Sequence, residues 1–168
     1  MAVEKKISEL TAKSTEIQPL DLLEVSEWNG ATFDTKSISG EKLILHTKVS
    51  LTAAQIKTGN SVPVTLIAAP GAGKIIDVTR CTFKYNYGTA IFDAASPNIF
   101  LTVDTATNSI LFAPSILTLT ATSFCQMSLS TTTIINVENK ALTFTTNNDS
   151  TVGDSTIDLY IDYRIITL

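Results

Sequence analysis

Charged residues are scarce in this sequence of 168 residues, and the residue types that carry most catalytic and metal chemistry are scarcer still. Charged side chains make up 17% of the chain, against roughly a quarter in an ordinary soluble domain, whereas apolar residues make up 44%. There is one histidine, and there are two cysteines without CxxC spacing. These residues are too few for a structural zinc site and offer little from which to build a catalytic triad. We therefore expect a non-enzymatic protein with no catalytic residues, cofactor or metal.

Basic clusters and long apolar runs are also missing. The net charge is −4, and the lysines and arginines are scattered, so the sequence predicts no nucleic-acid partner. The most apolar stretch, residues 109–125, is interrupted by Pro114 and by threonines, and it falls short of the roughly twenty apolar residues of a membrane span. The first residues lack the apolar core of a secretory signal. We expect no membrane partner and a chain that stays in the cell that makes it.

One stretch, IAAPGAGKII at residues 67–76, approaches the pattern of a phosphate-binding loop. That pattern requires a glycine where Ala68 stands and a hydroxyl residue where Ile75 stands, so two of its defining positions are missing. The residues after the stretch are β-branched and aromatic, as in a strand, whereas a phosphate-binding loop begins a helix. The sequence therefore favours a tight type II turn at Pro70-Gly71 over a nucleotide site.

Serine and threonine are abundant, at about a quarter of the chain, and they suit the surfaces of strands. After Asn60, roughly eight stretches rich in β-branched and aromatic residues alternate with turn-forming residues. This pattern predicts a mainly β chain whose body is an antiparallel β-sandwich or a jelly-roll-like domain. The expected strands are residues 61–69, 73–88, 98–105, 108–113, 115–123, 124–130, 132–147 and 155–168.

A short helix is expected just before these strands. Thr52 and Gln55 have the spacing of a capping box, in which each side chain accepts a hydrogen bond from the other residue's backbone N–H. Gly59 stands after them at the position of a left-handed C-cap. The preceding residues, 39–50, are expected to form a brief helical turn or an extended connector, which places His46 in a linker.

The N-terminal part of the sequence differs from the body. Residues 20–27 and 32–39 have the composition of two strands, joined by a type I′ turn at Asn29-Gly30. A hairpin of two strands is marginally stable alone and requires a partner surface. The expected division is an N-terminal segment with this hairpin, residues 1–46, and a β body with the short helix at about 52–58, residues 47–168.

The last strand has the clearest alternation. Five residues that we expect to be buried share one face: Ile157, Leu159, Ile161, Tyr163 and Ile165. The opposite face mixes acids with a tyrosine and an arginine, a composition common at subunit contacts, although local ion pairing explains it equally well. The residues predicted for an oligomer interface are Asp158, Tyr160, Asp162 and Arg164.

Three other features have a functional and a structural interpretation. Cys81 and Cys125 fall within strand patterns, and we expect both to be small buried apolar residues. The polar loop at residues 147–155 offers oxygen ligands for calcium but lacks the spacing of an EF-hand, so it is expected to be a polar turn. Trp28, Tyr85 and Tyr87 could stack on sugar rings if exposed, but Tyr85 and Tyr87 share a face with Phe83 and Cys81, which favours packing.

Two long segments resemble a known family. The first is KKISELTAKSTEIQPLDLLEVSEWNGATFDTKSISGEKL at residues 5–43, and it is similar to the N-terminal attachment segment of many tailed-phage structural proteins. The second runs from VSLTAAQIKTG at Val49 through the PVTLIAAPGAGK turn to the ending STIDLYIDYRIITL, and it is similar to phage virion proteins with the same turn and ending. The resemblance covers nearly the whole chain.

The resemblance implies a bacteriophage virion structural protein of the head-fibre, tail-fibre or capsid-decoration type, with crAss-like phages as one candidate source. It implies a homo-oligomer, most often a homotrimer, assembled in the host cytoplasm and fixed in the virion to a capsid, neck or tail protein. The alternative is a host-surface carbohydrate-binding module, with a surface glycan as its partner. The residues expected to make the virion attachment are Ile7, Leu10, Leu22, Leu23, Val25 and Trp28.

Overall fold

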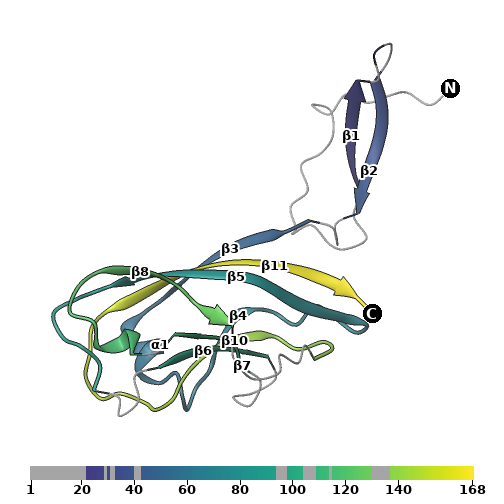
Figure 1. The fold of residues 1–168 in the computed structure, drawn as a ribbon. Helices are drawn as coiled ribbons and strands as arrows, with labels where there is room; N and C mark the ends of the chain where they lie inside the picture. Colours follow the sequence, from purple (N-terminus) through teal and green to yellow (C-terminus); the bar gives the residue numbers. More distant parts are fainter. Residues whose placement is uncertain are drawn as a thin grey trace. The chain divides into compact units, whose positions relative to one another are not determined.

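The computed structural model describes residues 22–28, 30, 33–39, 43–93, 98–103, 109–113, 115–129 and 137–168 (Figure 1). The chain separates into two compact units, Met1–Gly40 and Glu41–Leu168, and we call the second unit the body. Both units contain antiparallel β-structure, so the predicted fold class is confirmed. No helix in the described part of the chain is both long and apolar enough to cross a membrane.

The first unit contains the predicted hairpin. Strands β1 (Leu22–Trp28) and β2 (Phe33–Ser39) pair in antiparallel orientation along their full lengths. The last residue of β1, Trp28, pairs with the first residue of β2, Phe33. Gly30 has a φ of 99°, the positive value expected there. Asn29, the other residue of the predicted turn, lies outside the described residues.

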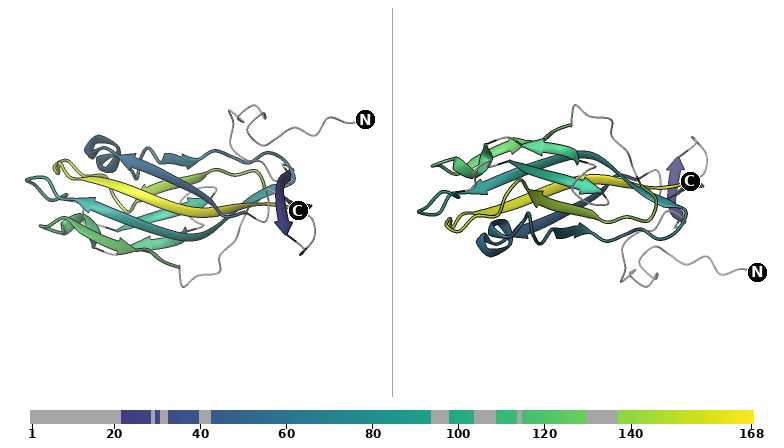
Figure 2. Two further views of the ribbon diagram at one scale, coloured as in Figure 1. Left: turned by 90° about the horizontal axis from the view of Figure 1, so that it is seen from above. Right: turned by 90° about the horizontal axis from the view of Figure 1, so that it is seen from below.

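The body is a β-sandwich of two antiparallel sheets (Figure 2). Within the described residues, one sheet has four strands in the order β3, β11, β5, β8, and the other has five in the order β4, β10, β6, β7, β9. The four-stranded sheet consists of β3 (Leu45–Leu51), β5 (Lys74–Asn86), β8 (Ser123–Gln126) and β11 (Thr156–Thr167). The five-stranded sheet consists of β4 (Val64–Ile67), β6 (Ile99–Val103), β7 (Ser109–Ala113), β9 (Ser128–Leu129) and β10 (Leu142–Thr146).

The core lies between the two sheets, and β11 shows how the sequence produces it. The five alternate residues of β11 that were predicted to be buried are between 0% and 8% exposed. In the five-stranded sheet, Leu101 and Phe144 are likewise fully buried. Burial of a large apolar side chain contributes about 1.5–3 kcal/mol. The two sheets are therefore held together by apolar contacts that strict alternation along the strands brings to one face.

The helix α1 (Ala53–Lys57) begins as predicted but ends differently. The Thr52 side chain accepts a hydrogen bond from the Gln55 N–H, and the Thr52 N–H donates to Gln55 Oε1 at 3.0 Å, which completes the capping box. Gly59 is buried and has no positive φ, so the predicted left-handed C-cap is wrong. A Cβ at Gly59 would lie 3.1 Å from the Phe144 ring, so the glycine permits close packing instead.

Residues 39–50, predicted as a connector, contain most of β3. This strand pairs with β11 from Leu45, opposite Tyr163, to Leu51, opposite Ile157. Its side chains alternate between half-buried and exposed, as in an edge strand with one face on the core. His46 therefore lies in a strand and not in a linker, and the boundary expected after residue 46 falls inside β3.

Two turns of the body test the remaining local predictions. Gly71 has the positive φ expected at Pro70-Gly71, 97°, but the turn itself lies two residues later, at Ala72-Gly73, where Gly73 has a φ of 73°. β5 follows directly, where a phosphate-binding loop would begin a helix. Residues 115–123, predicted as a strand, instead begin with the 3-10 turn η3 (Ile116–Thr118). Ser115 opens this turn with a φ of 54°, and the first two side chains of η3 are buried in the core. The apolar residues that suggested a strand here are instead side chains of a turn that packs into the core.

Candidate functional site

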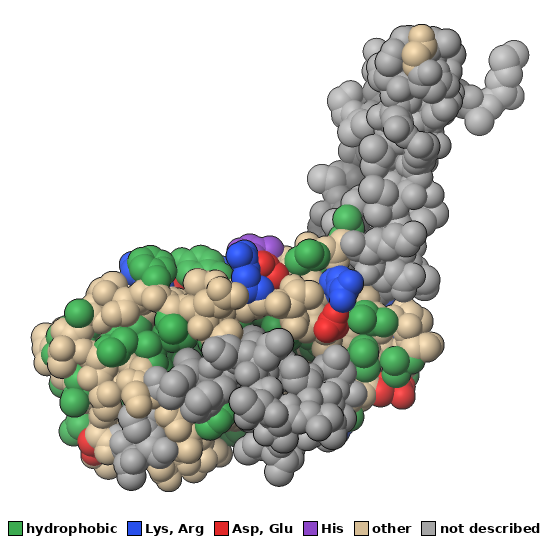
Figure 3. Space-filling model, viewed as in Figure 1, with side chains coloured by type: hydrophobic (Ala, Val, Ile, Leu, Met, Phe, Trp, Pro, Cys, Tyr) green, Lys and Arg blue, Asp and Glu red, His purple; other side chains and the backbone are tan. Residues whose placement is uncertain are grey.

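The residues predicted for an oligomer interface lie on the face of the four-stranded sheet that points away from the core, which we call the outer face. On this face, charged side chains and one tyrosine contact one another: His46, Lys48, Asp77, Arg80, Asp158, Tyr160, Asp162 and Arg164. In Figure 3, basic, acidic and histidine side chains gather along the upper rim of the body. Three adjacent strands, β3, β11 and β5, supply these residues.

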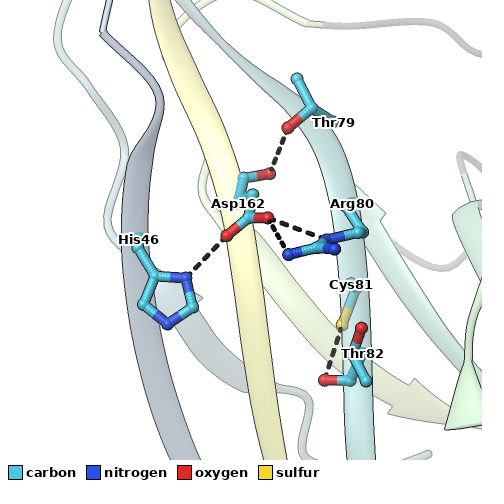
Figure 4. Close-up of polar contacts among 6 residues, drawn as sticks. All are labelled: His46, Thr79, Arg80, Cys81, Thr82 and Asp162. Atoms are coloured by element: carbon cyan, nitrogen blue, oxygen red, sulfur yellow. Dashed lines mark hydrogen bonds and ion pairs between the residues drawn. The ribbon is translucent and has the colours of Figure 1, made fainter.

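Asp162 is the centre of the network (Figure 4). The strand register places it between His46 on β3 and Arg80 on β5. Its Oδ1 lies 2.6 Å from His46 Nδ1, and its Oδ2 accepts hydrogen bonds from Arg80 Nε and Nη2, each at 2.9 Å. The hydrogen bond with His46 lowers the pKa of Asp162, and Arg80 lowers it further, whereas burial acts in the opposite direction. Asp162 is therefore held as a carboxylate.

A β-bulge in β5 makes this arrangement possible. Asp162 pairs with Arg80 and Tyr163 pairs with Val78, so Thr79 has no opposing residue on β11. Thr79 Oγ1 donates a hydrogen bond of 3.0 Å to the Asp162 carbonyl oxygen. Because the bulge interrupts the alternation, both Thr79 and Arg80 are exposed. Sequence periodicity therefore missed Arg80 as a partner of Asp162.

A second cluster surrounds Asp158. Its Oδ1 accepts a hydrogen bond of 2.6 Å from Ser50 Oγ, and its Oδ2 lies 3.3 Å from Lys48 Nζ. The Ser50 hydrogen bond lowers the pKa of Asp158, and the hydrogen bond with Asp158 raises the pKa of Lys48. Lys48 Nζ also lies 5.5 Å from the centroid of the Tyr160 ring, on which His46 stacks with a centroid separation of 6.5 Å. Tyr160 thus joins the two acidic clusters.

Arg164, the fourth predicted interface residue, forms an ion pair of 2.5 Å with Asp77 on β5. Each charged residue predicted for the interface on β11 therefore has an oppositely charged partner within its own sheet. Pairs between exposed groups contribute about 0–1 kcal/mol to stability. The structure shows the local ion pairing that was one of the two interpretations of this face, and its use as an interface remains a prediction.

The two cysteines have different environments. Cys81 on β5 is fully buried, as predicted, and burial raises the pKa of its thiol to about 12. Cys125 on β8 is exposed, so the prediction that it is buried is wrong. β8 lies at the edge of its sheet, where no further strand covers it among the described residues. Its neighbour Phe124 is 70% exposed, with Lys84 Nζ 5.8 Å from the ring centroid.

Two of the aromatic residues considered for sugar stacking are mainly structural. Tyr85 is fully buried, and its hydroxyl donates to the Leu117 carbonyl oxygen at 3.4 Å. Tyr87 is half-buried against the core, and its hydroxyl donates to the Thr89 carbonyl oxygen at 3.0 Å. Tyr85 cannot stack on a sugar in this position.

Among the residues predicted to attach to the virion, Ile7 and Leu10 lie outside the described residues. For the other four, only the place in β1 and the backbone pairing with β2 are described: Leu22, Leu23, Val25 and Trp28.

The acidic residues of the polar loop at 147–155 bind backbone groups of neighbouring loops. Asp149 Oδ1 accepts hydrogen bonds of 3.0 Å from two consecutive N–H groups, those of Asn60 and Ser61. Asp154 Oδ1 accepts from the N–H groups of Thr89 and Ala90 at 2.8 and 2.9 Å. These carboxylates therefore connect the loop at residues 147–155 to the loops that contain residues 60–61 and 89–90. In the described ranges, no group of three or more histidine, cysteine, aspartate or glutamate side chains is arranged to hold a metal ion.

The carboxylates that connect these loops predict that the protein loses stability in acid. Hydrogen bonds from the hydroxyls of Thr151 and Thr89 lower the pKa values of Asp93 and Asp154, respectively, to about 2 each, below the usual 3.8. A lowered carboxyl pKa adds stability above the unfolded-state pKa, and that stability is lost as the pH falls toward the folded-state value. We expect the melting temperature to be level above about pH 5 and to fall between about pH 4 and 2.

The variant Asp154→Asn tests this prediction, because it removes the charge of one of these carboxylates at every pH. Its thermal unfolding would be measured across the same pH range. It should melt at a lower temperature than the wild type at neutral pH, and the difference should shrink toward pH 2 because the wild type also loses the charge there. A constant difference from pH 7 to pH 2 would contradict this account of the loop contacts.

Comparisons with known proteins find little. No protein-family model matches the chain, and no curated protein matches it. Among solved structures, a chain from the "Cyanophage Pam1 capsid asymmetric unit" is similar, with 14% sequence identity and a TM-score of 0.41 over 97% of each chain.

Proposed function

We propose that this chain is a structural protein of a bacteriophage virion, of the head-fibre or capsid-decoration type, anchored by its N-terminal unit. The observation that carries this proposal is the division of the chain into a small hairpin unit and a separate β-sandwich. Because a two-stranded hairpin is marginally stable alone, it suits a docking element that is completed by a partner. The hairpin falls within residues 5–43, the segment that resembles phage attachment segments.

The body is proposed to associate with copies of itself, as a homotrimer, through the outer face. Two properties favour such a contact. The chain has few charges, and Asp158, Asp162 and Arg164 on the outer face each have an oppositely charged partner, so these groups would enter an interface already paired. Tyr160 lies among them, and tyrosine and arginine are enriched at subunit contacts. The residues proposed for this interface are Asp158, Tyr160, Asp162 and Arg164.

The test of the anchor is virion incorporation. Tagged full-length protein and a tagged fragment of residues 41–168 would be supplied during infection by the phage that encodes the chain, and purified particles would be probed for the tag. Truncation after Gly40 keeps β3 intact, and matching thermal unfolding of the body would verify that the fragment is folded. We expect the full-length protein in the particles and the fragment in none.

Each alternative outcome has a distinct meaning. Equal incorporation of both forms would reject the N-terminal anchor, and absence of the full-length protein from particles would reject the virion role. The native mass of the full-length protein, measured by light scattering, addresses the association separately. Three times 18.1 kDa is expected, and a monomer at all concentrations would reject the trimer.

A further inference from the structure

β8 lies at one edge of the four-stranded sheet, where no further strand of the described residues pairs with it, and part of its backbone is directed away from β5. The Met127 N–H donates to the Cys81 carbonyl oxygen at 3.0 Å, in the same register that pairs β8 with β5. In an antiparallel pair, every second residue directs its N–H and C=O to the partner strand. By this alternation the backbone of Cys125 faces β5, and the backbones of Phe124 and Gln126 face the open edge.

β8 also lacks the features that normally protect an edge strand. Edge strands are usually guarded by charged residues, prolines or bulges, which discourage pairing with another chain. β3, at the opposite edge of the same sheet, has Lys48 and His46, and β4 in the other sheet is preceded by Pro63. β8 has the sequence SFCQ, with no charge and no proline, and it pairs with β5 in unbroken register. Figure 2 shows β8 along one side of the body, opposite β3.

We propose that β8 pairs in antiparallel orientation with β8 of a second copy of the chain, about a twofold axis at Cys125. In this register Phe124 lies opposite Gln126 of the second copy, and Gln126 lies opposite Phe124 of the second copy. All outward N–H and C=O groups of the strand are then paired, in about four hydrogen bonds. The strand is uncharged, so the contact brings no like charges of β8 together.

The twofold register places Cys125 opposite itself. Its backbone faces β5, so the two copies meet at this residue as a non-hydrogen-bonded pair, with Cα atoms about 4.5 Å apart. That separation lies within the roughly 4.4–6.8 Å spanned by disulfides. The Cys125 thiol is exposed and lies 3.5 Å from the Gln126 carbonyl oxygen, one of the groups at the open edge. The thiol is therefore a reporter of the proposed pairing.

The contact uses few hydrogen bonds and a small area, so it is expected to form at high protein concentration or between copies held side by side. It is additional to the proposed trimer contact, which uses the face of the sheet and not its edge. It does not depend on the virion role, because it follows from the edge position of β8, its register with β5 and its lack of charge.

The experiment is oxidation of the full-length protein by diamide at increasing protein concentration, with electrophoresis without reductant as the readout. Diamide accepts the two electrons and two protons that two thiols release when their S–S bond forms. We expect a covalent dimer that is lost in Cys125→Ser, because the other thiol, Cys81, is fully buried. Absence of a covalent dimer at every protein concentration would overturn the proposal that β8 pairs with β8 of a second copy.

Matched variants separate specific pairing from random collision. In the Cys125→Ser background, Phe124→Cys and Gln126→Cys each place an exposed thiol on the same edge, but opposite the other position. In a dimer of one variant, the Cα atoms of the two introduced cysteines are about 8 Å apart, beyond disulfide range. In a mixed dimer, Cys at position 124 of one copy lies directly opposite Cys at position 126 of the other. We expect the mixture to form dimers at least about tenfold faster than either variant alone. Gln126→Cys alone reacting as fast as the native Cys125 would overturn the register.

Discussion

Replacing Gly153 by alanine is expected to lower the free energy of unfolding by about 2–5 kcal/mol. Two costs combine at this position. Gly153 has a φ of 110°, which side chains rarely adopt, and a Cβ there would lie 2.4 Å from Cδ1 of the Phe92 ring. The ring cannot easily move away, because Phe92 is only 1% exposed and is packed in the core. Urea unfolding of the full-length variant and the wild type measures the loss.

Gly71→Ala is the matched control for the steric part of this effect. Gly71 has a similar φ of 97°, but a Cβ there would have no atom within 4 Å. This variant should therefore show the backbone strain alone, about 1–3 kcal/mol. Equal losses at Gly71 and Gly153 would show that the contact with Phe92 adds nothing.

Phe83→Ala is expected to destabilise the body by about 3–5 kcal/mol, as for other fully buried aromatic residues. Phe83 lies on the inner face of β5 and is 0% exposed, so its truncation leaves a cavity between the sheets. Because β5 pairs with both β11 and β8, the strands on either side limit how far the cavity can collapse. Thermal or urea unfolding provides the measurement.

Phe124→Ala makes the same chemical change on the other face of the same sheet. Phe124 is 70% exposed, and we expect a change in the unfolding free energy within about 0.5 kcal/mol. A loss comparable to that of Phe83→Ala would mean that the Phe124 ring is covered in solution. The comparison therefore also reports on the β8 edge, where a second copy would bury part of this residue.

The outer face and the β8 edge offer two different kinds of contact. On the outer face, Asp162 and Asp158 hold basic side chains of both neighbouring strands, so an interface there would bury groups that are already paired. At the edge, the available groups are backbone N–H and C=O groups of Phe124 and Gln126. A contact between faces depends on side chains, and a contact between edges depends mainly on strand register, so substitutions can disrupt them separately.

Local features of this chain could be predicted from sequence because the residues that define them are adjacent or regularly spaced. The capping box at Thr52 and Gln55 depends on a spacing of three residues, and the buried face of β11 depends on a period of two. The positive φ of Gly71 was expected from the adjacent Pro70-Gly71 pair. None of these features requires knowledge of what packs against them.

Other features depended on partners that are distant in the sequence. Residues 45–51 became a strand because β11 pairs with them, and their short mixed pattern alone was ambiguous. Gly59 was expected to be a helix cap, but its role is set by the Phe144 ring, which is far along the chain. Cys125 was expected to be buried as its strand pattern suggested, but β8 is an edge strand, and only the order of strands in the sheet reveals an edge.

The sequence by itself determined the β class, the alternating core face of the last strand and the helix start, because backbone propensity and periodicity act over a few residues. Only the tertiary structure decided which strands are neighbours. That decision brought His46 and Arg80 to Asp162 and left β8 open at the edge. Strand order is fixed by which apolar faces enclose the core together, a property of the whole chain that no short stretch of sequence contains.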